Sequence, residues 1–380
     1  MNALIEKIID GLKLDRSEWK LVKFGDVAIQ QKDSVDRENS ELTRYVKGEH
    51  MYSEDLHLRE WGELADEYLG PAFIRKFEED DILYGSRRTY LRKVVIAPFD
   101  GITSNTTFVI KANEKKIDKR LLPFVMMSEG FAQHSIRNSK GSVNPYVNWK
   151  DLSGYEFLLP PKDQQAQLAK LFWSVDNVLQ KNINAFRKAI ITKQVCFDSG
   201  VASSSGKEYV LSKILMPKKS KSLAPHSRSK YIGLEHIESG SFSCTEYGES
   251  KDALAQCNLV DSGDLCYSKL RPYLDKAFIA DFDAVSTTEL LVYGTTLASK
   301  KYILYHLHSK PFINFVTGQG FGTKMPRVSH KIIGEYVVKV LDDEKSLLDE
   351  MTEYENIEKA FSEKIKSTKI LITSLINQVF

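Results

Sequence analysis

The sequence predicts a mixed α+β protein of the α/β class. We expect two tandem duplicated domains, separated by two long, antiparallel, coiled-coil-like helices and related by a pseudo-twofold axis. Three observations predict this architecture: a length of 380 residues, an internal repeat of about half the chain, and a long apolar stripe of helical period that ends each copy. The length allows two domains, each with a core of its own.

The repeat is clearest in a block of identities at one constant offset, in which Asp264 follows Asp81 by 183 residues. The first copy contributes Asp81, Tyr84, Arg88, Tyr90, Leu91, Lys93, Ile96, Ala97, Phe99 and Asp100, and the second contributes Asp264, Tyr267, Arg271, Tyr273, Leu274, Lys276, Ile279, Ala280, Phe282 and Asp283. Flanking identities have slightly different offsets, as loop insertions and deletions produce. A period this long indicates a duplicated domain and not a solenoid.

Each copy ends in a segment whose apolar residues recur at three- and four-residue steps, the spacing of one face of a helix. The two segments cover residues 161–197 and 342–380. About 35 residues would give a helix of roughly 50 Å, longer than an ordinary globular helix. A core helix within one globule is the alternative. We favour an antiparallel pair because the stripe recurs at equivalent places in both copies.

These boundaries define six segments. They are an N-terminal amphipathic helix over 1–18, a first domain over 19–160, a central helix over 161–197, a linker over 198–206, a second domain over 207–341 and a C-terminal helix over 342–380. The linker is predicted from its Gly and Ser content. Strands are expected at Val94–Ala97, Thr107–Ile110 and Glu289–Tyr293, and short helices at Leu121–Ser128 and Tyr302–His308.

Composition excludes several classes of protein. No apolar stretch approaches the roughly 18–20 residues of a membrane span, and the acids within the first ten residues are unlike a secretory signal, so we expect a cytoplasmic protein with no membrane contact. The four cysteines form no C-x-x-C pair, and we expect reduced thiols and no metal site.

Charge is segregated along the chain although the net charge is only +2. Residues 82–99, 130–150 and 309–334 contain no Asp or Glu, whereas acids crowd the C-terminal segment. This distribution suits a protein that holds nucleic acid on one surface and a protein partner on another.

No motif supports catalysis by this chain. Asn144-Pro145-Tyr146 lacks the second proline of an amino-methyltransferase loop, and the glycines of 318–322 are not part of a dinucleotide-binding unit. A phosphate-binding loop with lysine is also missing from the sequence. We therefore expect no catalytic residues and no cofactor in this chain.

Binding of double-stranded DNA fits the sequence better, because cations and aromatic residues alternate in matched loops of both copies. The candidate DNA-binding residues are Arg87, Arg88, Tyr90, Arg92, Lys93, Lys140, Asn144 and Tyr146 in the first copy, and Lys269, Arg271, Tyr273, Lys276, Lys324 and Arg327 in the second. Arg and Lys contact phosphates and guanine, and Tyr can bond phosphate oxygens. One basic stretch alone is more often a solvated face, but the recurrence favours DNA.

Comparison of the two copies suggests a division of labour. Residues that are identical in both, such as Arg88 and Arg271, are expected to contact phosphates or shape the loops. Residues that differ are better candidates for reading bases: Arg87 against Leu270, Arg92 against Asp275, Asn144 against Met325, and Tyr146 against Arg327.

The duplicated plan, the Ser268-Lys269-Leu270-Arg271-Pro272-Tyr273 element and the Gly141–Asn148 loop with the following Leu158–Gln165 resemble the specificity subunits of type I restriction–modification systems. The resemblance covers essentially the whole chain. It implies two target-recognition domains, each reading half of a split DNA site. It also implies two long helices that space them and dock two modification subunits, which carry the S-adenosylmethionine chemistry of DNA methylation. Two restriction subunits can join such a complex.

On this resemblance we expect the apolar stripes to bind the partner subunits. The candidate residues are Leu168, Phe172, Val175, Leu179, Phe186, Met351, Tyr354 and Phe361. The first copy departs from the family pattern, with Gly85-Ser86-Arg87-Arg88-Thr89-Tyr90 where the second copy has the family-like element. Two alternatives are open: an anti-restriction or scaffold protein that binds methyltransferase subunits without reading DNA, and a self-contained modification enzyme.

Overall fold

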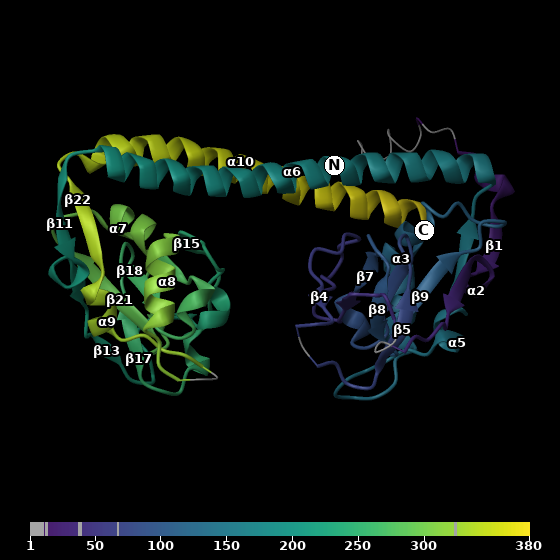
Figure 1. Ribbon diagram of the computed structural model, residues 1–380, viewed down its shortest axis with the longest axis horizontal. Coiled ribbons are helices and arrows are strands. Elements are labelled where there is room, and N and C mark those ends of the chain that lie inside the picture. The colour runs from purple at the N-terminus through teal and green to yellow at the C-terminus, as the bar shows by residue number, and fades with distance from the viewer. Residues whose placement is uncertain (1–10, 12–13, 37–39, 67, 323–324) are drawn as a thin grey trace. The chain divides into compact units, whose positions relative to one another are not determined.

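The computed structural model describes residues 11, 14–36, 40–66, 68–322 and 325–380. The chain forms two compact units (Figure 1): unit 1 is Met1–Asn184 with Ser362–Phe380, and unit 2 is Ala185–Phe361. The helix predicted over 1–18 lies mostly outside the described residues. At its end, Arg16–Glu18 form the 3-10 turn η1, where the Asp15 carboxylate accepts the backbone N–H of Ser17.

Unit 1 contains two four-stranded sheets and one strand pair. The sheet orders are β2-β9-β6-β7 and β4-β3-β8-β5, and β1 pairs with β10. The strands are β1 (Lys20–Lys23), β2 (Ala28–Gln31), β3 (Arg44–Val46), β4 (Gly62–Glu63), β5 (Phe73–Phe77), β6 (Ile82–Gly85), β7 (Val94–Ile96), β8 (Gly101–Ser104), β9 (Thr107–Ala112) and β10 (Glu156–Leu159).

Unit 2 repeats this arrangement with two five-stranded sheets, in the orders β12-β21-β18-β19-β15 and β13-β17-β20-β14-β16, and the pair β11-β22. The strands are β11 (Gly206–Val210), β12 (Leu215–Pro217), β13 (Lys221–Ser222), β14 (Lys230–Ile232), β15 (Ser243–Cys244), β16 (Gly248–Glu249), β17 (Cys257–Val260), β18 (Leu265–Ser268), β19 (Ala277–Ala280), β20 (Ala284–Ser286), β21 (Leu290–Thr295) and β22 (Val337–Leu341).

Strand pairing confirms that the domain is duplicated. In unit 1, β3 pairs parallel with β8 while β5 pairs antiparallel with β8. In unit 2, β14 and β17 flank β20 in the same two orientations. Such a mixed sheet, repeated in order and orientation, follows from duplication of one folding unit.

The central strands alternate between two cores because successive side chains of a strand point to opposite faces. On β6, Ile82 and Tyr84 enter the larger core of unit 1, and Leu83 enters a smaller one. On β18, Leu265 and Tyr267 face the larger core of unit 2, and Cys266 faces the smaller one. Burial on both faces explains why these strands are almost continuously apolar in sequence.

Short helices cover the larger core of each unit. The helices and 3-10 turns are α2 (Phe24–Val27), η3 (Thr89–Leu91), α3 (Leu122–Met127), α4 (Glu129–Arg137) and α5 (Trp149–Leu152) in unit 1, and η4 (Leu211–Lys213), η5 (Leu234–His236), η6 (Ser250–Asp252), η7 (Pro272–Leu274), α7 (Lys300–Leu307), α8 (Lys310–Gly318) and α9 (His330–Glu335) in unit 2. Serine hydroxyls cap the N-termini of α4, α7, α8 and α9.

The two predicted long helices are present as α6 (Lys162–Ser203) and α10 (Glu344–Val379). In unit 2, Lys193 contacts Glu358 and Cys196 contacts Tyr354. In unit 1, the Phe172 ring contacts the ring of Phe380. In unit 2 the partner numbers in α10 fall as those in α6 rise, so the two helices are antiparallel there, as predicted.

The linker predicted over 198–206 is wrong for 198–203, because α6 continues to Ser203 and β11 begins at Gly206. The residues have a packing role instead of a flexible one. A Cβ on Gly200 would lie 2.5 Å from Leu347 Cδ1, so glycine lets α10 approach closely, and Val201 packs against the core. The prediction failed because the small residues that allow close helix packing are the same residue types, Gly and Ser, that are typical of flexible linkers.

Among the described residues, no helix combines the length and apolar character that a membrane span requires. The cysteines Cys196, Cys244, Cys257 and Cys266 are all free.

A buried ion pair joins the two helices in unit 2. Lys193 Nζ donates to Glu358 Oε2 at 2.7 Å, and the two side chains are 5% and 16% exposed. Lys193 Nζ also lies 4.3 Å from the centre of the Phe242 ring and 5.6 Å from that of Tyr305. The ammonium is thus compensated by one carboxylate and two aromatic faces.

We predict that Glu358→Ala lowers the free energy of unfolding by about 3–5 kcal/mol, because it leaves the Lys193 ammonium buried without its carboxylate. The double variant Lys193→Met/Glu358→Leu should recover most of this loss, since an apolar pair leaves no uncompensated charge. Urea unfolding of the purified chain measures both. Glu363→Ala, at an exposed position of α10, is the control. Equal losses in the single and double variants would contradict the proposed role of the ion pair.

Stability should also depend on pH through His306. Burial lowers the pKa of this imidazole to about 4, against about 6.5 in the unfolded chain. Its contribution is complete above pH 6.5 and is lost as the pH falls towards 4, because only the unfolded chain binds the proton in that window. We expect the change in unfolding free energy between pH 7.5 and pH 4.5 to be smaller by about 2–3 kcal/mol in His306→Phe. An unchanged pH dependence would contradict this assignment.

Candidate nucleic-acid interface

Two loops that are far apart in sequence meet in each unit. We name them the arginine loop, residues 85–93 and 268–276, and the proline loop, residues 140–147 and 321–328. In unit 1, Arg88 N–H donates to Pro145 O at 2.6 Å and Val147 N–H donates to Ser86 O at 2.9 Å. In unit 2 the corresponding bonds are 2.7 Å from Arg271 N to Pro326 O and 2.9 Å from Val328 N to Lys269 O. The same main-chain frame is therefore built twice.

The arginine loops share an unusual backbone conformation. Arg88 and Arg92 flank η3 with φ of 50° at both residues, and Arg271 and Asp275 flank η7 with φ of 50° and 49°. The left-handed conformation is uncommon for residues other than glycine and persists only where surrounding contacts enforce it. The bonds to the proline loops provide that enforcement, so the two loops form one rigid structure.

Aromatic and apolar side chains stand exposed on these loops. Tyr90 and Tyr273, equivalent by the repeat, are 53% and 48% exposed. On the proline loops, Tyr146 is 43% exposed, Phe321 58% and Val143 83%. Apolar groups that remain in water on a rigid loop can contact sugars or the methyl group of thymine.

In unit 1, the predicted cations differ in how they are held. Arg87 is exposed, and Arg88 Nε donates to Asn144 Oδ1 at 2.8 Å. Lys140 Nζ pairs with Asp151 at 3.0 Å and remains more than half exposed. These three side chains can all reach an anionic ligand.

Arg92 and Lys93 are not placed as we predicted. The Arg92 guanidinium lies 2.8 Å from carboxylate oxygens of both Glu54 and Glu129. Lys93 Nζ donates to Gly48 O at 2.5 Å, and burial, with the nearby Arg88, lowers the pKa of Lys93. These two cations are engaged inside the domain, because a left-handed backbone at Arg92 turns this end of the loop towards α4. We interpret them as loop-positioning residues.

Unit 2 shows the same division. Lys276 Nζ donates to Leu234 O at 2.6 Å, as its counterpart Lys93 does to Gly48. Asp275, at the position of Arg92, receives a hydrogen bond from His308 Nδ1 at 2.8 Å if that nitrogen is protonated. Position 92/275, which we expected to read bases, therefore packs the loop against the domain in both units.

The remaining cations predicted in unit 2 differ in their exposure. Lys269 is partly exposed, and Arg327 Nε lies 3.3 Å from Glu289 Oε2 with its side chain 42% exposed. Arg271 Nε is buried and has no hydrogen-bond partner among the described residues. Lys324 lies outside the described residues.

The predicted partner-binding residues fall into two groups. Leu168, Phe172 and Met351 are fully buried and Leu179 nearly so, and the first three lie in the cores of the units. Their prediction as partner-binding residues is wrong, because the stripe packs against the chain's own domains and its other long helix. Val175, Phe186, Tyr354 and Phe361 are partly buried.

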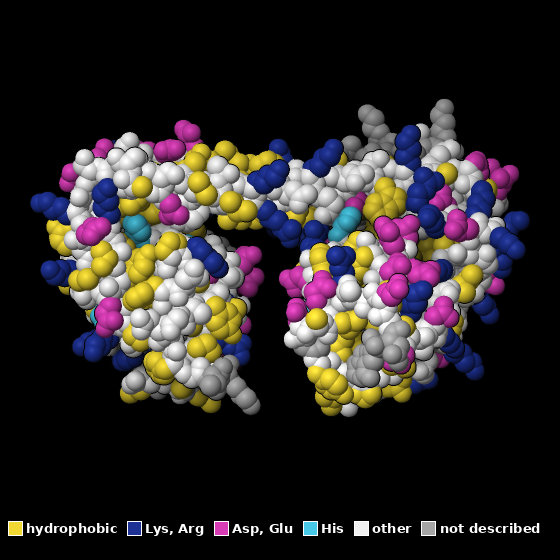
Figure 2. All heavy atoms as spheres, viewed as in Figure 1, with side chains coloured by type: hydrophobic (Ala, Val, Ile, Leu, Met, Phe, Trp, Pro, Cys, Tyr) yellow, Lys and Arg dark blue, Asp and Glu magenta, His cyan; other side chains and the backbone are white. Residues whose placement is uncertain are grey.

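Other helix residues, absent from the predicted set, present an apolar surface. On the visible face, hydrophobic side chains gather over α6 and α10 (Figure 2). In unit 2, Ile190, Ile191 and Val195 of α6 and Ile357 of α10 are between 42% and 64% exposed. Ile190, Ile191 and Ile357 are members of the apolar stripes of the sequence, so the helical spacing alone did not distinguish them from the buried members.

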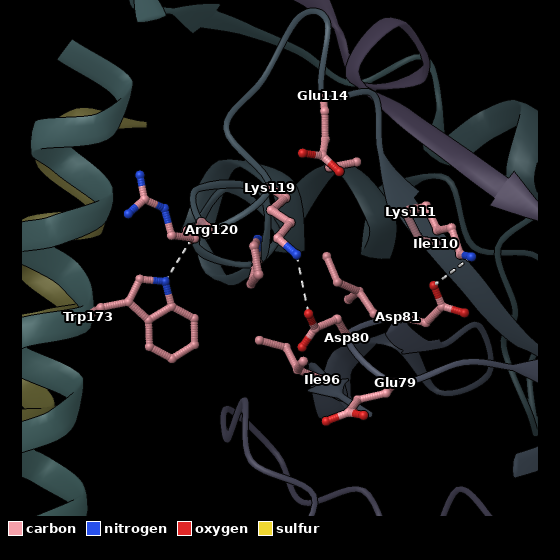
Figure 3. A pocket seen from close by; sticks show the side chains of 13 residues that line it. Glu79, Asp80, Asp81, Ile96, Ile110, Lys111, Glu114, Lys119, Arg120 and Trp173 are labelled. Atoms are coloured by element: carbon pink, nitrogen blue, oxygen red, sulfur yellow. Dashed lines mark hydrogen bonds and ion pairs between the residues drawn. The ribbon is translucent and has the colours of Figure 1, made fainter. Parts of the chain in front are cut away.

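Unit 1 also contains a cleft of about 400 Å³ beside α6 (Figure 3). Two ion pairs lie in its lining: Lys119 pairs with Asp80 at 3.2 Å, and Lys111 lies 3.7 Å from Asp81. Burial raises the pKa of Asp81, whose carboxylate accepts the backbone N–H of Glu78. Asp264 accepts the N–H of Asp261 in the same way, so this repeated aspartate caps a turn. Within the described part of the chain, no three His, Cys, Asp or Glu residues are grouped to hold a metal.

Residues 16–186 match the family described as "Type I restriction modification DNA specificity domain". Among curated proteins, the type I restriction enzyme EcoDI specificity subunit of Escherichia coli is 27% identical over 181 residues, which is 44% of this chain. The match spans 38% of that subunit's length.

Solved structures extend the comparison to nearly the whole chain. A structure described as "Structural basis underlying complex assembly and conformational transition of the type I R-M system" is 15% identical with a TM-score of 0.53, and covers 95% of this chain and 97% of its own. The S subunit of a type I restriction–modification system from M. genitalium is 12% identical with a TM-score of 0.48, over 95% and 96%. The structure with the TM-score of 0.53 confirms the predicted fold class. The resemblance to type I specificity subunits is confirmed for residues 16–186 by the family match.

Arg271, whose Nε has no hydrogen-bond partner among the described residues, leads to a prediction about electrostatics. We expect Arg271→Gln to weaken DNA binding for all sequences and to make the slope of log affinity against log salt shallower by about 0.9, the value of one phosphate contact. Fluorescence anisotropy at several salt concentrations measures this slope. Lys251→Gln, an exposed cation of unit 2 outside both loops, is the matched control. The same change in slope for both variants would show a general charge effect and contradict a contact at Arg271.

Proposed function

Because residues 16–186 match the type I DNA specificity domain, we propose that this chain is the DNA-recognition subunit of a type I restriction–modification enzyme. The observation that carries the proposal is the joined pair of loops, built with the same main-chain bonds in both units. A chain with two such structures is suited to contact two half-sites of one bipartite DNA target.

We propose that the chain performs no bond chemistry. The exposed groups of its loops are cations, phenols and apolar side chains, which bind phosphates and base edges. The S-adenosylmethionine and the methyl transfer belong, on this proposal, to two modification subunits. Two restriction subunits could join through them, and the complex would act in the cytoplasm.

The long helices are proposed as the spacer between the half-sites. α6 begins in unit 1 and ends in unit 2, and α10 returns from unit 2 to unit 1. Both helices contribute residues to the larger core of each unit. If the helices act as a spacer, we expect the two half-sites to lie about one DNA turn, ~34 Å, apart.

The exposed apolar surface of Ile190, Ile191, Val195 and Ile357 is proposed as part of the docking site for a modification subunit. Isolated exposed apolar residues are ordinary, but several on neighbouring antiparallel helices form a patch of the kind that marks protein contacts. The chain's own domains leave this surface uncovered.

The experiment that tests the function is methylation sequencing of DNA from cells that co-express this chain with its modification subunit. We expect a split motif, methylated on both strands and absent without this chain. Ile191→Glu should reduce both methylation and co-purification, since a charge in the docking patch must be desolvated. Thr245→Glu, exposed in the body of unit 2, is the control.

The outcomes separate the candidate functions. Co-purification without new methylation would favour the scaffold or anti-restriction protein. Binding of S-adenosylmethionine by the isolated chain would favour the self-contained modification enzyme. Reduced co-purification in the Thr245→Glu control would contradict the assignment of the docking patch.

A further inference from the structure

Glu289 connects the two loops of unit 2 just before β21 begins. Its carbonyl oxygen accepts the backbone N–H of Lys269 from the arginine loop at 3.0 Å. Its carboxylate Oε2 lies 3.3 Å from Arg327 Nε of the proline loop. The Glu289 side chain is 26% exposed and that of Arg327 is 42% exposed. The Glu289 carboxylate is thus less exposed to solvent than the guanidinium with which it pairs.

A carboxylate at this place is unexpected on a surface that binds a polyanion. Residues 309–334, which include the whole proline loop, contain no Asp or Glu, and neither do residues 265–274 of the arginine loop and its preceding strand. A carboxylate near DNA phosphates is repelled unless a cation compensates it. Arg327 is the cation that pairs with this carboxylate, so we interpret Glu289 and Arg327 as one unit.

Unit 1 provides an internal comparison. Thr106 occupies the position of Glu289, because its carbonyl oxygen accepts the backbone N–H of Ser86 at 3.3 Å as that of Glu289 accepts Lys269. Tyr146 occupies the position of Arg327, as shown by its equivalent pairing with the arginine loop. The acid is therefore present in the unit whose proline loop carries the arginine, and absent in the other.

The contact has a defined chemical consequence. A guanidinium carries five N–H donors in a planar fork. When Nε faces the carboxylate, the plane and rotamer of the side chain are restricted, and the outer edge of the guanidinium, formed by one N–H of each terminal NH₂ group, points away from the carboxylate. Guanine presents two acceptors, O6 and N7, at its major-groove edge, and a bidentate arginine is its commonest specific partner. A restricted fork loses less side-chain freedom on binding than a free one.

We propose that Glu289 is a positioning residue that orients Arg327 to read a guanine in the half-site contacted by unit 2. This inference rests on the proposed DNA-recognition function and specifies the base for one of its residues. Arg88 in unit 1, held by Asn144, has its own oriented Nε, so the two units present different arginines on the same frame.

The test compares the methylated motifs of four chains co-expressed with the modification subunit: wild type, Arg327→Lys, Glu289→Gln and Glu335→Gln. Arg327→Lys keeps the charge but removes the fork. Both site variants should lose the preference for guanine at the same single position of one half-site, by about 5-fold or more, the lower range of a good bidentate contact. The other half-site should be unchanged. Glu335→Gln, a matched substitution at an exposed position of unit 2, should retain the complete motif.

Thermal unfolding of the purified variants separates a positioning role from a role in folding. A merely structural role would lower the thermal stability without changing the base preference at a single position of the motif. An unchanged motif in Glu289→Gln would overturn the positioning role. Weaker methylation with no change of base preference at any position of the motif would also overturn it, because this result would identify Arg327 as a phosphate contact. A wild-type chain that directs no methylation would contradict the proposed function itself, and with it this inference.

Discussion

The antiparallel contact between α6 and α10 is the constraint on which both units depend. In unit 1 it completes the larger core with Leu168 and Phe172 of α6 and Leu375 of α10. In unit 2 it does so with Phe197 of α6 and Met351 of α10. A change in the register of the two helices would therefore disturb both cores at once. The buried Lys193–Glu358 pair favours one register, because any shift would leave a charge buried without its partner.

Main-chain hydrogen bonds join the arginine loop to the proline loop in each unit. The bonds from Arg88 to Pro145 and from Arg271 to Pro326 involve backbone atoms only, so they do not depend on which side chains the loops carry. Inward-facing lysines, Lys93 and Lys276, stabilise the same frame in both units by donating to carbonyl oxygens. The exposed side chains can then differ between the units without altering the frame, which is what two different half-sites would require.

Charge alone would have misidentified several binding residues. Arg92 is held by two carboxylates, Glu54 and Glu129, although it lies in an acid-free stretch of sequence. Arg327, by contrast, keeps a large part of its side chain in solvent while a single carboxylate, Glu289, faces its Nε. The number and direction of its partners decide whether a cation is held within the protein, as Arg92 is, or remains partly exposed to solvent, as Arg327 does.

The sequence by itself determined the duplication, the positions of the two long helices and the two matched basic loops. These are local or periodic properties: ten identities at one offset, apolar residues at helical spacing, and cations next to aromatic residues. Tertiary structure alone decided which apolar residues pair within the chain, since Leu168 and Ile191 are equally apolar but only Leu168 is buried. It likewise decided that 198–203 are helical, because the close approach of Leu347 to Gly200 is a contact between segments far apart in sequence. Glu289 was overlooked for the same reason: its significance comes from a contact with Arg327, 38 residues away, which no local pattern contains.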